Sequence, residues 1–455
     1  MNKWFHEKGF LKSVAAIALP VALQNLISFG VSVTDTVMLG MLGEVQLSAS
    51  AQANQPQFLF ALLTFGLAGG GSVLTSQYWG KKNLEAIRRV IGIVLRVAIV
   101  VSLLLTAAVL LFPRQIMGFY LKDEAVIAEA VRYLKIVGWG YFFFGITNTF
   151  TSIIRSVEIV RISVIISIIS FIENAILNYI FIFGHFGAPA MGIQGAAIGT
   201  LSARITEFVL ITIYALFVDK KLQFRIRYIF RRDMLLLKDY IRYSVPVVVN
   251  ELAWACGISL QAAILGRLSV AVVSANSIAS VLQQLATIAI FGIANASCVI
   301  VGKKIGEGNM KGAQGAAQTL MLWSVLLGIV ASLMMFLTRK QFAGIYNITA
   351  ETRELTENLL IITSIVVFFV SLAATSIVGV LRGAGDTKFA LKLELIALWC
   401  VAVPVGAFAG LVLEVPVLVA YAFLKIDEPI KAVIAFIRTT RPETYRNVTR
   451  TENFH

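Results

Sequence analysis

The chain has 455 residues, of which 58% are apolar and only 14% carry a charge, and its formal net charge is +14. Soluble proteins carry about 25% charged residues, so this composition excludes an ordinary soluble enzyme and predicts a chain that lies mostly in lipid. The basic excess alone would suit a nucleic-acid partner, so its distribution along the chain decides between the two readings.

Twelve apolar segments are long enough to cross about 30 Å of hydrocarbon as helices. They run over residues 14–40, 48–79, 90–112, 131–154, 162–183, 193–218, 243–266, 274–301, 317–338, 358–381, 389–412 and 415–437. The first segment is longer than the core of a signal peptide and lacks a small-residue cleavage site, so we expect it to be retained. We therefore predict an all-α integral membrane protein with twelve transmembrane helices.

Basic residues gather in the connections after even-numbered segments and at both ends of the chain. Examples are Lys81 and Lys82 after segment 2, the run 220–242 after segment 6, and the run 438–450 after segment 12. This alternation follows the positive-inside rule and predicts that both termini are cytoplasmic. We expect a multi-pass protein of a bacterial inner membrane, whose basic excess faces anionic lipid and not a nucleic acid.

The second half of the chain repeats the first half at an offset of about 226 residues, the distance from Pro20 to Pro246. Leu39-Gly40 likewise corresponds to Leu265-Gly266. Internal repeats of spanning segments are typical of transporters. Because each half has six spans, we predict two parallel six-helix repeats related by a pseudo-twofold axis along the membrane normal. The predicted parts are an N-lobe (1–218), a cytoplasmic linker (219–242), a C-lobe (243–438) and a cytoplasmic tail (439–455).

The sequence contains no Walker A loop, zinc motif or hydrolase elbow. Its three cysteines, Cys256, Cys298 and Cys400, stand singly in apolar segments. We expect them to be packed small side chains without disulfide or metal-binding roles. These features predict a protein that is not an enzyme and needs no cofactor, so that any active transport would draw on an ion gradient.

Asp35 is the clearest polar residue inside a predicted span, because it stands in segment 1 with no other charge near it in the sequence. A charge in a spanning helix costs about 2.5–3.5 kcal/mol on insertion scales, so its presence needs an explanation. We interpret Asp35 as an ion- or proton-binding carboxylate in a cavity. The alternative is a structural carboxylate that is hydrogen-bonded to neighbouring helices.

Segments 5 and 6 supply neutral polar side chains that could join this carboxylate. Asn174 and Asn178 are four residues apart and therefore share one helix face, and Thr200 follows in segment 6. With Asp35 they would offer one negative charge and several neutral oxygens, a set that suits Na⁺ better than a divalent cation. The alternative is hydrogen bonding between helices through the amides.

Glu251 is the second acid in a predicted span, and it follows Pro246 by about one turn in segment 7. A carboxylate in a water-filled vestibule attracts organic cations, so we interpret Glu251 as a substrate- or proton-binding residue. A pairing role near the start of the helix is the alternative. The repeat counterpart of Asp35 is Gln261, so the two acids do not occupy equivalent positions.

The last span of each half carries two opposite charges three residues apart. Arg204 and Glu207 in segment 6 correspond to Lys425 and Glu428 in segment 12. This spacing permits pairing within a helix. We interpret all four residues as structural, with a part in conformational gating as the alternative.

Several short motifs stand in a recognisable order from about residue 10 to 440. They are Leu19-Pro20 followed by the run 34–43, Gly80-Lys81-Lys82-Asn83, the runs 174–179 and 192–197, and the run 382–388. Together they make the sequence similar to the multidrug and toxic compound extrusion (MATE) family. The resemblance implies a V-shaped twelve-helix antiporter that exports cationic or amphipathic organic compounds in exchange for Na⁺ or H⁺ through a rocker-switch.

The resemblance also implies roles for individual residues. Asp35 matches the coupling carboxylate of the family's first helix, and Asn174, Asn178 and Thr200 match residues that help to bind the cation. Glu251 resembles a seventh-helix glutamate that some members use for substrate or proton binding.

Two positions depart from the pattern of some members. Segment 10 (358–381) lacks the acid that these members carry there, and Asn178 stands where they have Asp. The resemblance therefore does not extend to a cation site in the C-lobe. We expect the protein to act as a monomer in lipid on small organic cations.

Three other functions fit parts of the sequence. A flippase for lipid-linked oligosaccharides is the main alternative, but it would need cavity arginines, whereas segments 1, 2, 7 and 8 carry acids and no basic residue away from their ends. A carrier of the major facilitator type would usually show a Gly-x-x-x-Asp-Arg loop in place of Gly80-Lys81-Lys82-Asn83. A membrane scaffold would have little reason to keep Asp35 and Glu251 within apolar spans.

Overall fold

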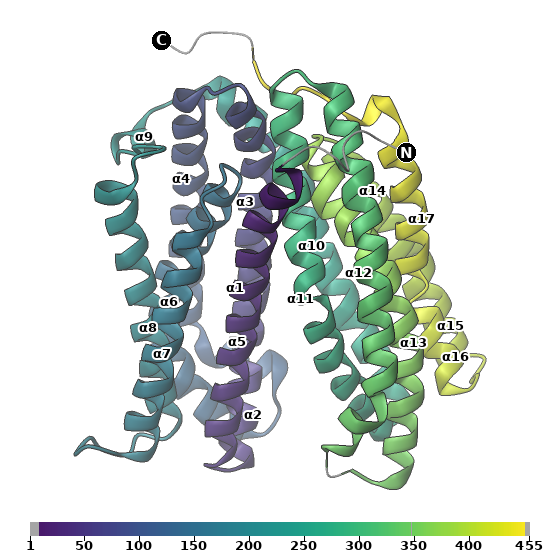
Figure 1. Ribbon diagram of the computed structural model, residues 1–455. Coiled ribbons are helices and arrows are strands. Elements are labelled where there is room, and N and C mark those ends of the chain that lie inside the picture. The colour runs from purple at the N-terminus through teal and green to yellow at the C-terminus, as the bar shows by residue number, and fades with distance from the viewer. Residues whose placement is uncertain (1–8, 347, 451–455) are drawn as a thin grey trace. The chain divides into compact units, whose positions relative to one another are not determined.

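The computed structural model describes residues 9–346 and 348–450, and all regular structure in these ranges is helical (Figure 1). The first half contains α1 (Phe10–Gly40), α2 (Glu44–Ala53), α3 (Gln55–Gly80), α4 (Leu84–Leu111), α5 (Pro113–Tyr120), α6 (Glu124–Arg155), α7 (Arg161–Phe183) and α8 (Ile193–Ile213). The connector and the second half contain α9 (Arg227–Phe230), α10 (Met234–Leu268), α11 (Val270–Gly306), α12 (Met310–Gly344), α13 (Ala350–Ala374), α14 (Thr387–Glu394), α15 (Val403–Leu411), α16 (Val417–Leu424) and α17 (Asp427–Thr440). Three helices continue through π-helical turns, η2 (Tyr214–Val218), η3 (Thr375–Leu381) and η4 (Leu395–Ala402), and η5 (Pro442–Thr444) is a 3₁₀ turn.

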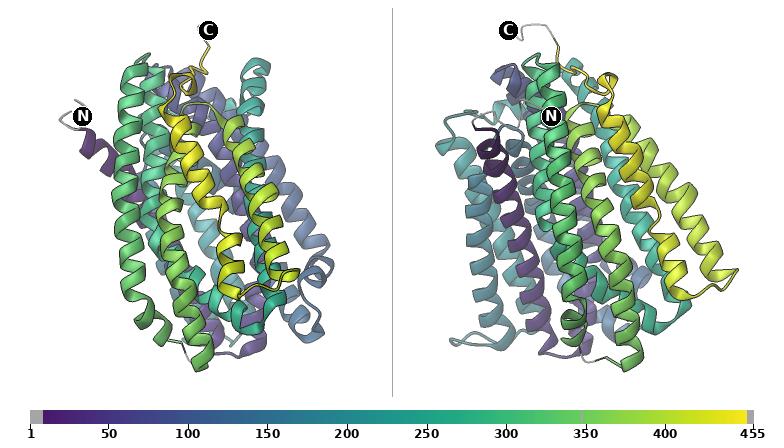
Figure 2. Two further views of the ribbon diagram at one scale, coloured as in Figure 1. Left: turned by 90° about the vertical axis from the view of Figure 1, so that its right-hand side faces the viewer. Right: turned by 45° about the vertical axis from the view of Figure 1, so that its right-hand side comes forward.

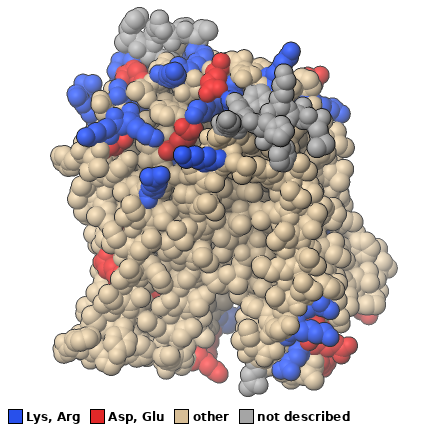
Figure 3. Space-filling model, viewed as in Figure 1, with Lys and Arg blue, Asp and Glu red and all other residues tan. Residues whose placement is uncertain are grey.

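Ten helical segments within the described residues are long and apolar enough to cross a membrane. The other two of the twelve predicted spans lie in α6 and in α16 with α17. Leu326, Val330, Leu333 and Leu337 of α12 recur on one helix face and are each more than half exposed, as expected of a face that contacts lipid. The surface shown in Figure 3 carries few charged side chains across its middle. The prediction of an all-α membrane protein is confirmed, and the twelve-span arrangement stays a prediction.

Prolines interrupt two segments that the sequence predicted to be continuous. Segment 2 is divided into α2 and α3 at Asn54, two residues before Pro56. Segment 12 is divided into α16 and α17 at residues 425–426, just before Pro429. A proline inside a helix lacks the amide hydrogen and its ring clashes with the carbonyl four residues earlier, so the chain bends away at both places.

The chain folds into two compact units, each with its own core. The first unit comprises Leu23–Gly71 and Leu84–Ile241, and its α6–α8 and α7–α8 pairs pack side by side. The second unit comprises the residues up to Ala22, Ser72–Asn83 and the residues from Arg242 onward. In it α11, α12 and α13 pack together, and α17 lies beside α13 (Figure 2). The end of α3 thus groups with the second half, and the predicted lobes, which would keep it in the first half, remain a prediction.

The predicted linker is a folded connector that packs on α4 within the first unit. Arg96 Nε donates to the carbonyl of Ile229 at 2.7 Å, and Arg89 forms an ion pair with Asp233 at 3.3 Å. We call the helix ends of the second unit that adjoin the loops 81–83, 307–309 and 382–386 the basic end. Of the three cysteines, only Cys298 is buried as predicted, whereas Cys256 and Cys400 are exposed.

Candidate functional site

Asp35 of α1 meets the polar face of α7 in the first unit. Asn178 Nδ2 donates to Asp35 Oδ1 at 2.6 Å and to Asn174 Oδ1 at 3.3 Å. Asn174 and Asn178 are buried, and Asp35 is partly exposed. The four-residue spacing places both amides on the α7 face that meets α1, so the structure brings together the three polar residues that the sequence predicted for these helices.

Two further oxygens adjoin this contact. Within the described residues, Asn178 Oδ1 is buried without a hydrogen-bond partner, whereas the Thr200 hydroxyl interacts with the buried hydroxyl of Tyr133, which also senses the charge of Asp35. Asn178 Oδ1 packs against Gly199 of α8, in the space where a Cβ of that residue would stand. A buried polar atom without a partner costs about 1–3 kcal/mol, so this group of oxygens is suited to a ligand that interacts with acceptors. A monovalent cation or a proton fits a single carboxylate surrounded by neutral oxygens.

The predicted pair on α8 forms next to this site. Arg204 Nη1 donates to Glu207 Oε2 at 3.0 Å, and Ser170 Oγ of α7 donates to Glu207 Oε1 at 2.7 Å. The Arg204 guanidinium also stacks over the ring of Phe144 at 4.7 Å and acts electrostatically on Asp35. These contacts hold the positive charge of Arg204 in the neighbourhood of the Asp35 carboxylate.

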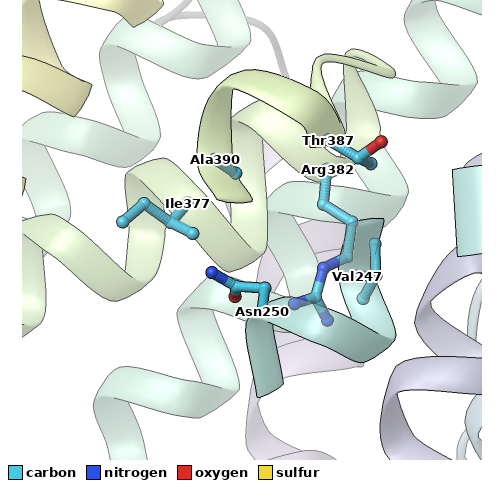
Figure 4. A pocket seen from close by; sticks show the side chains of 6 residues that line it. All are labelled: Val247, Asn250, Ile377, Arg382, Thr387 and Ala390. Atoms are coloured by element: carbon cyan, nitrogen blue, oxygen red, sulfur yellow. The ribbon is translucent and has the colours of Figure 1, made fainter. Parts of the chain in front are cut away.

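Glu251 of α10 is buried in the second unit and pairs with Arg382, which follows η3. Arg382 Nη2 donates to Glu251 Oε1 at 2.6 Å, and both side chains are almost inaccessible. Arg382 and Asn250 line a small pocket with Val247, Ile377, Thr387 and Ala390 (Figure 4). In this structure Glu251 is paired with Arg382, which is the alternative interpretation given for it above. The predicted substrate or proton role of Glu251 remains a prediction that requires this ion pair to open.

The internal repeat reappears when the chain is compared with known families. A family model described as MatE matches residues 20–180 and again residues 246–408, so the two matches begin 226 residues apart and together cover more than half of the chain. The chain belongs to the MATE family. It is therefore a membrane transporter and not an enzyme, as the sequence predicted.

This MATE protein is similar over most of its length to bacterial relatives. It is 27% identical over 400 residues to the probable multidrug resistance protein NorM of Rhizobium meliloti, with 87% of this chain and 84% of that protein covered. It is 25% identical over 405 residues to the multidrug resistance protein MdtK of Yersinia pseudotuberculosis, with 88% of each covered. A solved structure described as the outward-facing conformation of a MATE transporter matches with a TM-score of 0.85 at 17% identity over 94% of both chains, which shows the MATE fold.

The second charged pair of this MATE protein is arranged differently from the first. Lys425 Nζ donates to Gln261 Oε1 at 3.1 Å, and Glu428 accepts from Lys431 at 2.7 Å. Lys425 and Glu428 therefore do not pair with each other, although their spacing equals that of the pair on α8. The break before α17 separates them, because Pro429 cannot continue a helix through residue 425.

The sequence analysis missed a cluster of buried charges on α14 and α17. Lys431 Nζ lies 2.8 Å from Asp427 Oδ2, 2.7 Å from Glu428 Oε1 and 3.2 Å from Glu394 Oε1. Asp427, Glu394 and Lys431 are almost completely buried. The three- and four-residue spacings to Lys431 within segment 12 were a usable signal for part of this cluster. The contact with Glu394 depends on the packing of two helices and had no local signal.

Proposed function

We propose that this MATE protein is a secondary active exporter of cationic or amphipathic organic compounds, which it exchanges for Na⁺ or H⁺. In this proposal twelve helices form two parallel repeats, and the basic end faces the cytoplasm of a bacterial cell. The names of the NorM and MdtK relatives support multidrug efflux as the activity. The chemistry of the Asp35 site supports coupling to a monovalent cation.

The observation that carries the proposal is the group of neutral oxygens around one carboxylate, of which Asn178 Oδ1 is buried without a partner. Asp35 would supply the charge, while Asn174, Asn178 and Thr200 would supply neutral oxygens, as in the cation site that the sequence predicted. Binding of the cation from outside would favour the conformation that releases the organic compound, since a ligand shifts a conformational equilibrium only by its differential affinity. One-for-one exchange of a monovalent cation for a monovalent organic cation moves no net charge, so a tenfold gradient of the coupling ion, about 1.4 kcal/mol, sustains roughly a tenfold concentration ratio of the organic cation.

The direct test is transport in proteoliposomes with each gradient imposed separately. The purified protein would be reconstituted with a fluorescent organic cation, and either a Na⁺ gradient or a pH gradient would be applied. We expect one of the two gradients to drive accumulation of the dye against its concentration gradient. Passive equilibration of the dye under both gradients would contradict ion-coupled export.

Gly199→Ala is expected to impair ion-coupled transport about tenfold or more without unfolding the protein. A methyl group there would displace the Asn178 amide from Asp35, and a misplaced binding group can cost rate by this order of magnitude. The end of one flexible side chain can move more easily than backbone, so the fold should persist. Gly118→Ala is the matched control, because nothing lies near the added methyl group. Equal transport by both variants would show that the Asn178 contact is dispensable.

Two variants distinguish the proposed substrate-binding role of Glu251 from its ion pair with Arg382. We expect Glu251→Gln to weaken the apparent affinity for an organic cation about tenfold, because a charge-assisted contact contributes roughly 1.5–3 kcal/mol. The double variant Glu251→Gln/Arg382→Gln also removes the guanidinium that faces Glu251 and should remain impaired. The KM for the dye would be measured in proteoliposomes. Recovery of the wild-type KM in the double variant would leave Glu251 with the pairing role alone.

A lipid-linked oligosaccharide flippase remains the alternative, and no contact described above favours it. Such a flippase would need free arginines to face a pyrophosphate. Arg204 pairs with Glu207, and Arg382 pairs with Glu251, so each of these guanidinium groups is already matched by a carboxylate. Failure of all organic cations as substrates, together with transfer of a labelled polyprenyl-pyrophosphate lipid, would support the flippase.

A further inference from the structure

We infer that Gln77 and the residues 445–450 form a latch that holds the basic end of α3 against the second half of the chain and that opens in every transport cycle. This inference rests on the proposed exchange cycle. We call residues 445–450, which have no regular secondary structure, the tail strand. All contacts of the latch lie within the second unit.

Gln77 is a fully buried amide whose hydrogen bonds all go to backbone groups distant in the sequence. Its Nε2 donates to the carbonyl of Gly383 at 3.1 Å and to that of Arg446 at 3.0 Å. Its Oε1 accepts from the amide of Val448 at 2.8 Å. These three bonds favour one arrangement of α3 and its neighbours. If any of them were broken without a replacement, a buried polar atom would lose its partner at a cost in free energy. Gln77 therefore joins α3 to two separate segments of the second half.

The tail strand extends this attachment along α3. The amide of Arg450 donates to Tyr78 Oη at 3.2 Å, and Lys81 Nζ donates to the carbonyl of Arg450 at 3.3 Å. The strand is itself fixed to the second half, since the amide of Arg446 donates to the carbonyl of Ala384 at 3.1 Å. Tyr445 packs in a core cluster of α11, α12 and η3 and donates from its hydroxyl to the carbonyl of Thr439.

The helices under the latch touch through glycines at equivalent positions of the repeat. The carbonyl of Lys303 occupies the space that a Cβ of Gly80 would need, and the carbonyl of Gln77 occupies the space that a Cβ of Gly306 would need. Gln77 corresponds to Lys303, and Gly80 to Gly306, at the offset of 226 residues. The ends of α3 and α11 thus meet reciprocally, with the backbone contact that small residues permit between spanning helices.

The latch breaks the symmetry of this contact. The repeat counterpart of Gln77 is a lysine, which lacks the acceptor that Gln77 offers to Val448. The tail strand therefore recognises the end of α3 through an acceptor that the equivalent position of α11 lacks. In the proposed exchange cycle α3 and α11 part when the basic end opens, so we infer that the bonds of Gln77 to the tail strand break at that step and reform when the end closes. Gln77 is accordingly a positioning residue for the closed state.

A reversible cross-link tests whether the latch opens during transport. Lys81→Cys/Arg450→Cys would be introduced into a chain whose Cys256, Cys298 and Cys400 are replaced, and bridged with a short, reducible thiosulfonate reagent. We expect the bridged protein to transport about tenfold more slowly or worse, with recovery on reduction, because a locked conformational step limits turnover. The matched control is Ala384→Cys/Arg446→Cys, which ties the same strand to the second half alone and should leave transport unchanged. An unchanged rate in the bridged Lys81→Cys/Arg450→Cys protein would overturn the latch.

Hydrogen exchange tests the latch without relying on transport. Gln77→Leu keeps the side-chain volume and removes the amide, and deletion of the residues from Arg446 onward removes the strand but spares Tyr445. We expect both to speed amide exchange in Ser72–Asn83 about tenfold or more, since local opening governs exchange. Gln115→Leu, an exposed position on α5, is the control. Unchanged hydrogen exchange in both variants would refute the latch. Failure of the wild-type protein to transport under either ion gradient would contradict only the proposed function.

Discussion

Asp35→Asn is expected to abolish ion-driven efflux while the protein remains folded. The substitution keeps the shape of the side chain but removes the only charge in the group formed with Asn174, Asn178 and Thr200. Without that charge the cation has no site from which to bias the conformation, so the concentration ratio that a tenfold ion gradient sustains should fall from roughly tenfold to about one. The measurement is dye accumulation in proteoliposomes, with size-exclusion chromatography of the same preparation to report folding.

Glu173→Gln provides the matched control for this substitution. Glu173 lies on α7 beside Asn174, whereas the hydrogen bond to Asp35 comes from Asn178. The two variants remove the same charge from neighbouring positions in the membrane, and we expect Glu173→Gln to retain driven efflux. Full accumulation by Asp35→Asn would exclude the coupling role, whatever the control showed.

Lys431→Met is expected to destabilise the protein by about 3–5 kcal/mol, the cost of breaking a buried ion pair from one side. The lysine is 2% exposed and lies within 3.2 Å of three carboxylates, which would be left in a buried site without a compensating charge. Thermal unfolding of the protein in detergent, followed by the loss of monodisperse protein, would show a large fall in the midpoint temperature.

Lys340→Met is the control for the loss of a lysine, because Lys340 is exposed at the end of α12. It should unfold at the wild-type temperature. Adding Glu394→Gln and Glu428→Gln to Lys431→Met removes two of the three unpaired charges and should recover part of the lost stability. A midpoint unchanged by Lys431→Met would mean that the ammonium does not stabilise this cluster.

The sequence predicts local features of this molecule well because they depend on residues close together in the chain. The apolar segments predicted the helices, and the four-residue spacing of Asn174 and Asn178 predicted the polar face that meets Asp35. The offset of 226 residues predicted two related halves, and the family model matches residues 20–180 and 246–408 separately.

Partners on different helices could not be predicted in the same way. Glu251 and Arg382 are 131 positions apart, and nothing local to either residue indicates the other. Lys425 and Glu428 show a different limit. Their spacing matched that of Arg204 and Glu207, but Pro429 breaks the helix and redirects Lys425 to Gln261. The rule for spacing within a helix holds only where the helix is continuous.

Competition between the cation and an organic substrate in equilibrium binding tests the coupling most directly. Two ligands linked through one conformational equilibrium must change each other's affinity by the same factor. Binding of radiolabelled Na⁺, or release of protons, would be titrated against a fluorescent organic cation with the purified protein and with Asp35→Asn. If exchange is coupled at Asp35, each ligand should weaken the affinity for the other by the same factor in the wild type. In Asp35→Asn this mutual weakening of affinity should be lost. Independent binding in the wild type, or undiminished competition in Asp35→Asn, would contradict it.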